Sequence, residues 1–106
     1  MQKLTRSLFT TSSRRLFSKR YFIVEYTYVE DAYYKRIPHK EQHLKQIETL
    51  KSDGKTKVMG APFYPYDGCA LLFETEGDRA SIESFVEKDP YVKNKLVTGY
   101  AIKEFE

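Results

Sequence analysis

Few side chains in this sequence could do acid–base or metal chemistry, among them the two histidines, His39 and His43, and the single cysteine, Cys69. On a helix, His43 shares the apolar stripe of Ile47 and Leu50, because these residues follow it by four and seven positions. The imidazole should then point inward or into a cleft. Since its unperturbed pKa is about 6.5, it can take up and return a proton near neutral pH. His43 is therefore the candidate general base.

A metal site is not predicted. His39 lies four residues before His43, which permits a shared ion on one helix face, but Glu41 occupies the third place of this segment, whereas the zinc-protease pattern needs glutamate in the second. No third ligand is evident. Cys69 cannot form an internal disulfide, and in the apolar stretch 69–73 it is interpreted as a small buried hydrophobic residue. The sequence predicts no cofactor.

Two helices are predicted. The first begins at Pro38, a residue favoured in the first turn, and ends at Gly54, with an apolar stripe of Leu44, Ile47 and Leu50. The second starts after Asp78 as N-cap and stops near Lys88, because Pro90 disfavours helical geometry at Asp89. Its buried side is predicted to be Ile82, Phe85 and Val86.

Four segments have the composition of strands, at residues 21–28, 55–59, 69–75 and 96–105. With the two helices they give the order βαββαβ. This order predicts a ferredoxin-like α+β fold, in which a four-stranded antiparallel sheet carries both helices on one face. A chain of 106 residues has room for one such domain.

The other face of this sheet poses a question, because the first strand is apolar or aromatic on both sides. Phe22, Val24, Tyr26 and Tyr28 alternate with Tyr21, Ile23 and Thr27. An antiparallel sheet open to water on one side should instead alternate cleanly between apolar and polar residues. We expect a second subunit to cover this face.

Residues 1–20 have the composition of a mitochondrial presequence, and residues 21–106 form the predicted domain. The first segment holds six of the eighteen basic residues, seven hydroxyl residues and no acid. It lacks the continuous apolar core of a secretory signal. The run Arg15-Leu16-Phe17-Ser18 predicts cleavage after Phe17, in the matrix. A chloroplast address and a merely disordered basic tail are the alternatives.

Charge and hydropathy exclude two further classes of function. Residues 21–106 hold twelve basic and fifteen acidic residues, a net charge of −3, whereas a nucleic-acid surface needs a clustered excess of cations. No apolar run approaches the roughly twenty residues that span a bilayer. We therefore expect neither nucleic-acid binding nor a membrane span.

Several short motifs resemble the YCII-related family across nearly all of residues 21–106. They are His43-Leu44-Lys45-Gln46-Ile47, Gly54, Gly60-Ala61-Pro62, Asp67-Gly68, Leu71-Leu72-Phe73-Glu74 and Asp89-Pro90-Tyr91-Val92. The resemblance implies a ferredoxin-like domain that dimerises sheet to sheet as a dimeric α+β barrel. It also implies a pocket with a histidine and an aspartate as an acid–base pair, which are His43 and Asp89 here. Many relatives carry arginine three residues before the histidine, where this chain has Lys40.

Three functions follow from these observations. The first is a small matrix enzyme that uses His43 and Asp89 for proton transfer, elimination or isomerisation on a small polar organic molecule. The second is a non-catalytic ligand-binding homodimer. The third is an accessory subunit of a mitochondrial assembly, in which a helix-end histidine is bonded to a structural aspartate. The sequence leaves open whether the protein is an enzyme.

Overall fold

The computed structural model describes residues 19–106. Its elements follow in the order β1 (Arg20–Tyr28), α3 (Ala32–Lys35), the 3-10 helix η1 (Ile37–His39), α4 (Lys40–Lys51), β2 (Thr56–Pro62), β3 (Gly68–Thr75), α5 (Arg79–Lys88), α6 (Pro90–Lys93) and β4 (Val97–Phe105). The predicted presequence thus lies outside the described residues, except for Lys19 and Arg20. Arg20 is the first residue of β1, one position before the predicted start of the domain.

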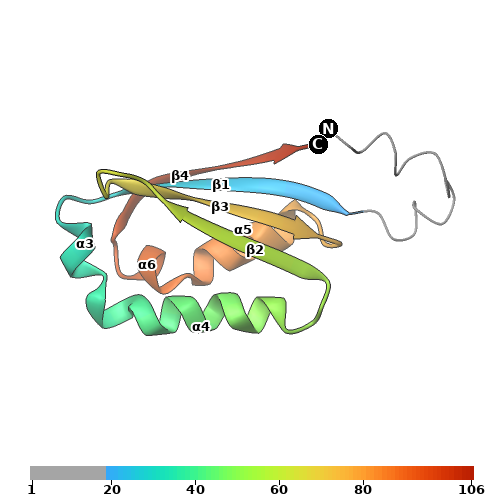
Figure 1. Ribbon diagram of the computed structural model, residues 1–106, viewed down its shortest axis with the longest axis horizontal. Helices are drawn as coiled ribbons and strands as arrows, with labels where there is room; N and C mark the ends of the chain where they lie inside the picture. The colour runs from blue at the N-terminus through green and yellow to red at the C-terminus, as the bar shows by residue number, and fades with distance from the viewer. Residues whose placement is uncertain (1–18) are drawn as a thin grey trace, which may run out of the picture.

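The strands form one antiparallel sheet in the order β2-β3-β1-β4. Helices α4, α5 and α6 all lie on one side of it (Figure 1). The predicted α+β fold, with four antiparallel strands and the helices on one face, is therefore confirmed. No helix within residues 19–106 is long and apolar enough to cross a lipid bilayer.

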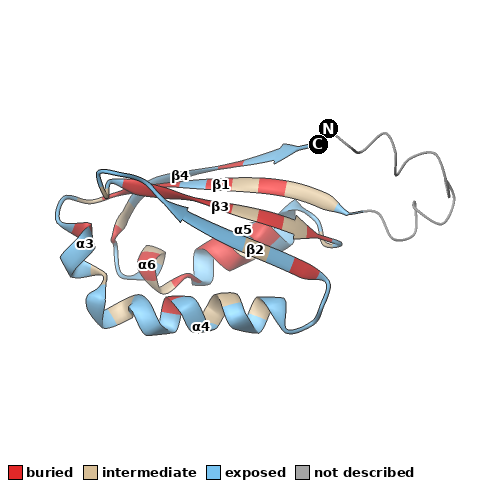
Figure 2. Ribbon diagram, in the orientation of Figure 1, coloured by how far each residue is buried: buried red, intermediate tan, exposed pale blue. Residues whose placement is uncertain are grey.

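The core lies between the sheet and the helices. Alternate side chains of β1 point into it and are buried, and the predicted inward face of α5 meets them: Phe22, Val24, Tyr26, Tyr28, Ile82, Phe85 and Val86. Figure 2 shows this pattern as buried segments on the inner strands and on α5. Burial of each large apolar side chain contributes about 1.5–3 kcal/mol to the free energy of unfolding.

Several details differ from the prediction, among them two short helices, α3 and α6, that were not predicted. Strand β2 continues through Pro62, which an edge strand tolerates because the missing N–H is not needed for pairing. The short helix α3 has no strong periodic signal in the sequence. Leu44 is 49% exposed, whereas Ile47 and Leu50 pack against the core. One residue turns a helix by about 100°, so the side chain that follows the buried His43 points away from the sheet.

Candidate functional site

Asp89 occupies the joint between α5 and α6. As the residue before Pro90 it has extended backbone angles, φ −64° and ψ 125°, which end α5. The same residue is the N-cap of α6, where its Oδ1 accepts a hydrogen bond from the N–H of Tyr91 at 2.9 Å. Its side chain is completely buried. The backbone turn therefore fixes the carboxylate in one orientation.

His43 reaches this carboxylate from α4. Its Nδ1 lies 2.8 Å from Asp89 Oδ1, and the residue is 7% exposed. The contact joins residues 46 positions apart in the chain. The structure thus brings together the two residues that the sequence predicted as a pair.

Tyr26 is a third member of the cluster. It points inward from the middle of β1 and donates its hydroxyl to Asp89 Oδ2 at 2.7 Å. Burial, reinforced by the neighbouring Asp89, raises the pKa of Tyr26 far above its usual range, so the phenol keeps its proton. Asp89 therefore meets donors at both oxygens: the phenol at Oδ2, and the Tyr91 amide and His43 at Oδ1.

Tyr91 fixes the plane of the imidazole. Its ring stacks on that of His43, with 4.0 Å between centroids and an interplanar angle of 8°. Because Asp89 is an acceptor, the neutral His43 carries its proton on Nδ1 and leaves Nε2 unprotonated. No protein group within residues 19–106 bonds Nε2 of His43. A buried Nε2 would therefore be an unsatisfied polar atom, but the only such side-chain atom in this range is Gln46 Oε1. Nε2 is thus not buried and contacts solvent.

An aromatic cluster adjoins Tyr91 at the same end of the sheet. The ring of Tyr28 contacts those of Tyr66, at 5.1 Å between centroids, and Tyr91, at 6.3 Å. Tyr33 of α3 packs edge-on against Tyr66 at 5.4 Å. The guanidinium of Arg36 lies over both Tyr33 and Tyr66. A cation and several phenols thus lie beside the His43–Tyr91 stack.

Sequence reasoning did not assign Tyr26 or Arg36 to the site. For Tyr26 a signal existed, since a tyrosine on the inward face of a central strand needs a partner for its hydroxyl, which implies a buried acceptor. For Arg36 no such signal existed. It becomes part of the site only through α3, which folds it back over rings from other segments.

The other residues considered from the sequence lie apart from this arrangement. His39 ends η1 and is partly exposed, and Lys40 is exposed at the start of α4. Cys69 is buried on β3, and burial raises the pKa of its thiol, which keeps it protonated and unreactive. Within residues 19–106, histidine, cysteine and acidic side chains form no group of three or more that could hold a metal ion.

A hollow of about 350 Å³ lies at the other end of the helical layer. It is bounded by the end of α4, the start of α5 and the buried hydroxyl pair of Thr56 and Thr75, whose oxygens are 2.9 Å apart. His43 and Asp89 are not among its walls. This hollow therefore does not open onto the imidazole.

Two solved structures share this fold. The chain is similar to the 5-chloro-2-hydroxyhydroquinone dehydrochlorinase TftG from Burkholderia phenoliruptrix AC1100, solved in complex with 2,5-dihydroxybenzoquinone, at 24% identity and a TM-score of 0.67, over 81% of this chain and 93% of that one. It is also similar to Rv0793 from Mycobacterium tuberculosis, at 12% identity and a TM-score of 0.57, over 84% and 94% of the two chains. At these identities the likeness establishes the fold.

Comparison with the curated proteins gives no match. A family model does match, and it covers residues 20–106, the whole of the sheet and its helices. The motifs that carried the resemblance, among them the segments around His43 and Asp89, lie within this range. The chain belongs to the family of YCII-related domains.

Proposed function

We propose that this protein is a small acid–base enzyme in which His43 moves a proton on a small polar organic molecule. The observation that carries the proposal is the position of Asp89, a completely buried carboxylate 2.8 Å from Nδ1 of a histidine whose other nitrogen meets solvent. A purely structural contact has no need to leave Nε2 open. General bases of this kind contribute about 10²- to 10⁴-fold to a rate.

The proposed reaction transfers a single proton in each step. Nε2 takes a proton from an activated C–H or O–H group of the substrate, and the resulting imidazolium is stabilised by the carboxylate at Nδ1. In an isomerisation the proton then returns to another atom of the substrate. In an elimination the electron pair of the broken C–H bond forms the new double bond, the leaving group departs with the pair of its own bond, and the imidazolium passes its proton to the leaving group or to solvent. Both outcomes use the same His43–Asp89 contact.

The structural neighbour TftG supports this class of reaction, since its name describes an elimination and its structure holds a hydroxyquinone. The first test is therefore deuterium exchange at activated C–H groups. The full chain is incubated in D₂O with small hydroxyquinones, including 2,5-dihydroxybenzoquinone, and with keto acids, and the loss of substrate proton signals is followed by NMR. Catalysed exchange with at least one compound is expected. Exchange that His43→Ala performs equally well would contradict the role of His43.

The alternative is a non-catalytic ligand-binding or accessory subunit. It is favoured by exposed aromatic side chains, since Tyr64 is fully exposed and Tyr34 is 68% exposed. Such residues are frequent in protein interfaces. Absence of exchange with every compound, together with co-purification in a stable assembly, would favour this alternative.

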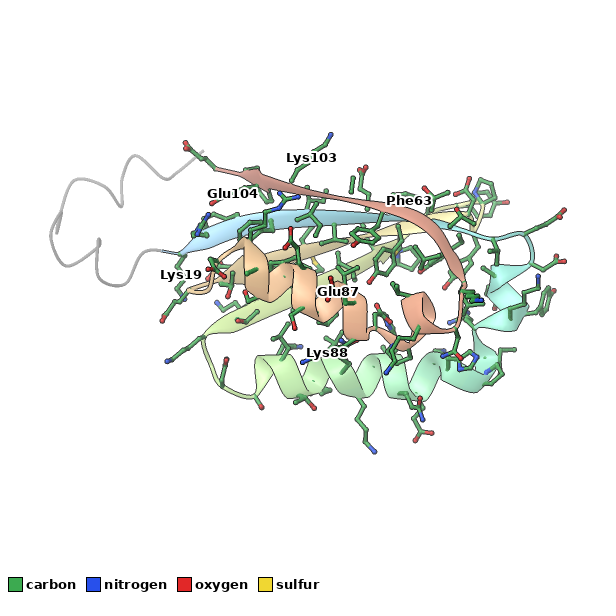
Figure 3. The ribbon with its side chains drawn as sticks, turned by 180° about the vertical axis from the view of Figure 1, so that it is seen from behind. Lys19, Phe63, Glu87, Lys88, Lys103 and Glu104 are labelled. Carbon is green, nitrogen blue, oxygen red and sulfur yellow. The ribbon has the colours of Figure 1, made fainter. Side chains whose placement is uncertain are left out.

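We also propose that a second copy of the chain covers the open face of the sheet. Directly paired strand residues lie on the same face, and on this face they include Tyr21, Ile23, Met59, Leu72, Ala101 and Phe105. Met59 is 60% exposed and Phe105 43% exposed. In Figure 3 the charged Lys103 projects from β4 on the side away from the helices. The same face carries Glu25 and Glu74 on the central strands and Lys57 and Lys103 on the edge strands, so apolar side chains and charges of both signs would meet their copies in a sheet-to-sheet homodimer.

The homodimer predicts a mass of about twice the monomer in analytical ultracentrifugation of the full chain at micromolar concentration. Leu72→Asp should shift the protein to monomer, because a carboxylate would be desolvated in the centre of the interface. Leu44→Asp is the matched control, since Leu44 is exposed on the helical side of the molecule. A monomeric wild type, or equal effects of the two variants, would refute the arrangement.

The proposed location is the mitochondrial matrix. It rests on the basic and acid-free composition of residues 1–20, followed by an acidic domain. Residues 1–25 fused to a fluorescent protein should direct it to mitochondria. The same fusion with Arg14 and Arg15 replaced by glutamate is the control, and it should stay cytosolic. Diffuse cytosolic signal from the unaltered fusion would disprove the presequence.

A further inference from the structure

Arg36, between α3 and η1, is held in an unusual setting for an arginine. Its guanidinium carbon lies 4.6 Å from the ring centroid of Tyr33 and 5.2 Å from that of Tyr66, and its Nε donates to the carbonyl oxygen of Tyr33 at 3.1 Å. The two rings come from α3 and from the loop between β2 and β3. The guanidinium is therefore fixed in place by aromatic faces, with a restricted set of side-chain conformations.

No carboxylate neutralises this cation within the described residues. The ion pairs found in residues 19–106 involve Lys19, Arg20, His43 and Arg79, and Arg36 belongs to none of them. A guanidinium has five N–H donors in a rigid fork. One donates to the Tyr33 carbonyl and the Tyr91 phenol engages the guanidinium as well, so only part of the fork is left for a ligand. Arg36 thus combines a preorganised position with free donor capacity and an uncompensated charge.

Tyr91 connects Arg36 to the imidazole. Its ring stacks on His43, and its side chain interacts with the guanidinium. Burial raises the pKa of the Tyr91 phenol, and the neighbouring Arg36 acts in the opposite direction. Tyr91 therefore contacts both the imidazole and the guanidinium, which places the cation at the same end of the sheet as the base.

We propose that Arg36, framed by Tyr33 and Tyr66, is the anchor for a negatively charged oxygen of the substrate, so that the substrates of His43 are small planar carboxylates or phenolates. The inference rests on the proposed function, in which His43 reacts with one part of the substrate, and it adds that Arg36 binds another part. The aromatic side chains favour a flat ring, and the guanidinium fork donates its N–H groups to the anionic oxygen in its plane. Lys40, the residue in the place where many relatives carry arginine, is exposed and does not share these contacts.

The test is binding of benzoate to the full chain, followed by NMR chemical shifts of the His43 side chain and by calorimetry. Wild type should bind benzoate saturably with a dissociation constant on the order of 1 mM, and should bind the neutral isostere benzamide at least about tenfold more weakly. Arg36→Gln should weaken benzoate binding at least about tenfold, the usual effect of losing a charged hydrogen bond. Arg36→Lys, which keeps the charge but loses the fork, should fall between them.

Lys35→Gln is the matched control, because it removes an exposed cation from the adjacent residue and should leave benzoate affinity unchanged. Circular dichroism of each variant establishes that it is folded. His43→Ala should retain benzoate binding, so failure of catalysis and failure of the anchor give different results. Equal binding of benzamide, equal effects of Arg36→Gln and Lys35→Gln, or no saturation of wild type by benzoate would each overturn the proposal.

Discussion

Replacement of His43 by alanine should lower turnover at least about a hundredfold in the deuterium-exchange assay, with any compound that the wild type accepts. The imidazole is the base in the proposed step. Its Nδ1 bonds the buried carboxylate of Asp89, and its Nε2 faces solvent. The protein should still fold, because the residue is on one helix face and not in the centre of the core. His39→Ala is the matched control, since His39 lies one turn earlier and has no such partner.

Asp89→Asn should cause a loss of similar size for a different reason. Asparagine has the same shape, and its amide oxygen can still accept from the Tyr91 N–H and from His43 Nδ1. Its amide group can donate to Tyr26, whose hydroxyl accepts as well as donates. The fold and the tautomer are therefore kept, while the negative charge that stabilises the imidazolium disappears. Rates should fall, and thermal stability should fall less than in Asp89→Ala, because only the Tyr26 hydroxyl proton loses its acceptor.

The double variant shows whether His43 and Asp89 act together or contribute to the rate independently. If His43 and Asp89 act together, combining His43→Ala with Asp89→Asn should cost little beyond either single change. Rate losses that multiply would mean that the two residues contribute separately. In that case the contact in the structure would be a packing feature, and the accessory-subunit alternative would become the better one.

Asp89→Ala should have the largest effect on stability among single changes in this cluster. The buried carboxylate accepts from the Tyr26 hydroxyl, the Tyr91 N–H and His43, and removing it leaves all of these donors without a partner. Each unsatisfied buried group costs about 1–3 kcal/mol, so a loss of at least about 3 kcal/mol is expected. For a domain of this size that lowers the melting temperature by roughly 10–20 °C.

Urea unfolding and a thermal melt followed by circular dichroism measure this loss. Tyr26→Phe removes one of the three donors and the partner of one oxygen, and should cost about 1 kcal/mol. Glu87→Ala, at an exposed position of α5 close in sequence, is the control and should stay within about 0.5 kcal/mol of wild type. An Asp89→Ala protein as stable as this control would mean that water enters and replaces the carboxylate.

The sequence was sufficient for the fold because its signals were local and agreed with one another. The alternation of Phe22, Val24 and Tyr26 placed these residues on one face of a strand, which the structure shows to be the inward face. Asp78 marked the start of α5, where its carboxylate accepts from the N–H of Ser81 at 3.2 Å. Pro90 fixed where α5 ends. Each of these effects acts over a few residues, so a pattern in the chain is enough to predict it.

The rest of the site depends on contacts between distant segments, which periodicity does not encode. The His43–Asp89 pair was expected from family resemblance, while the stripe placed only His43. The stripe also predicted burial of Leu44, which the actual rotation of α4 leaves exposed. Arg36 reaches the site because α3 and the loop of Tyr66 converge on it. Such convergence is a property of tertiary packing, and no single segment carries a signal for it.

The double use of Asp89, as the cap of α6 and as the partner of His43, would lower the entropy cost of the proposed proton transfer. A carboxylate whose only partner was the imidazole would lose side-chain freedom when positive charge develops on the ring. Here the Tyr91 amide and the Tyr26 hydroxyl already restrict its rotamer in the resting protein. Charging the imidazole therefore requires little reorganisation of its surroundings, since the ordering took place when the chain folded.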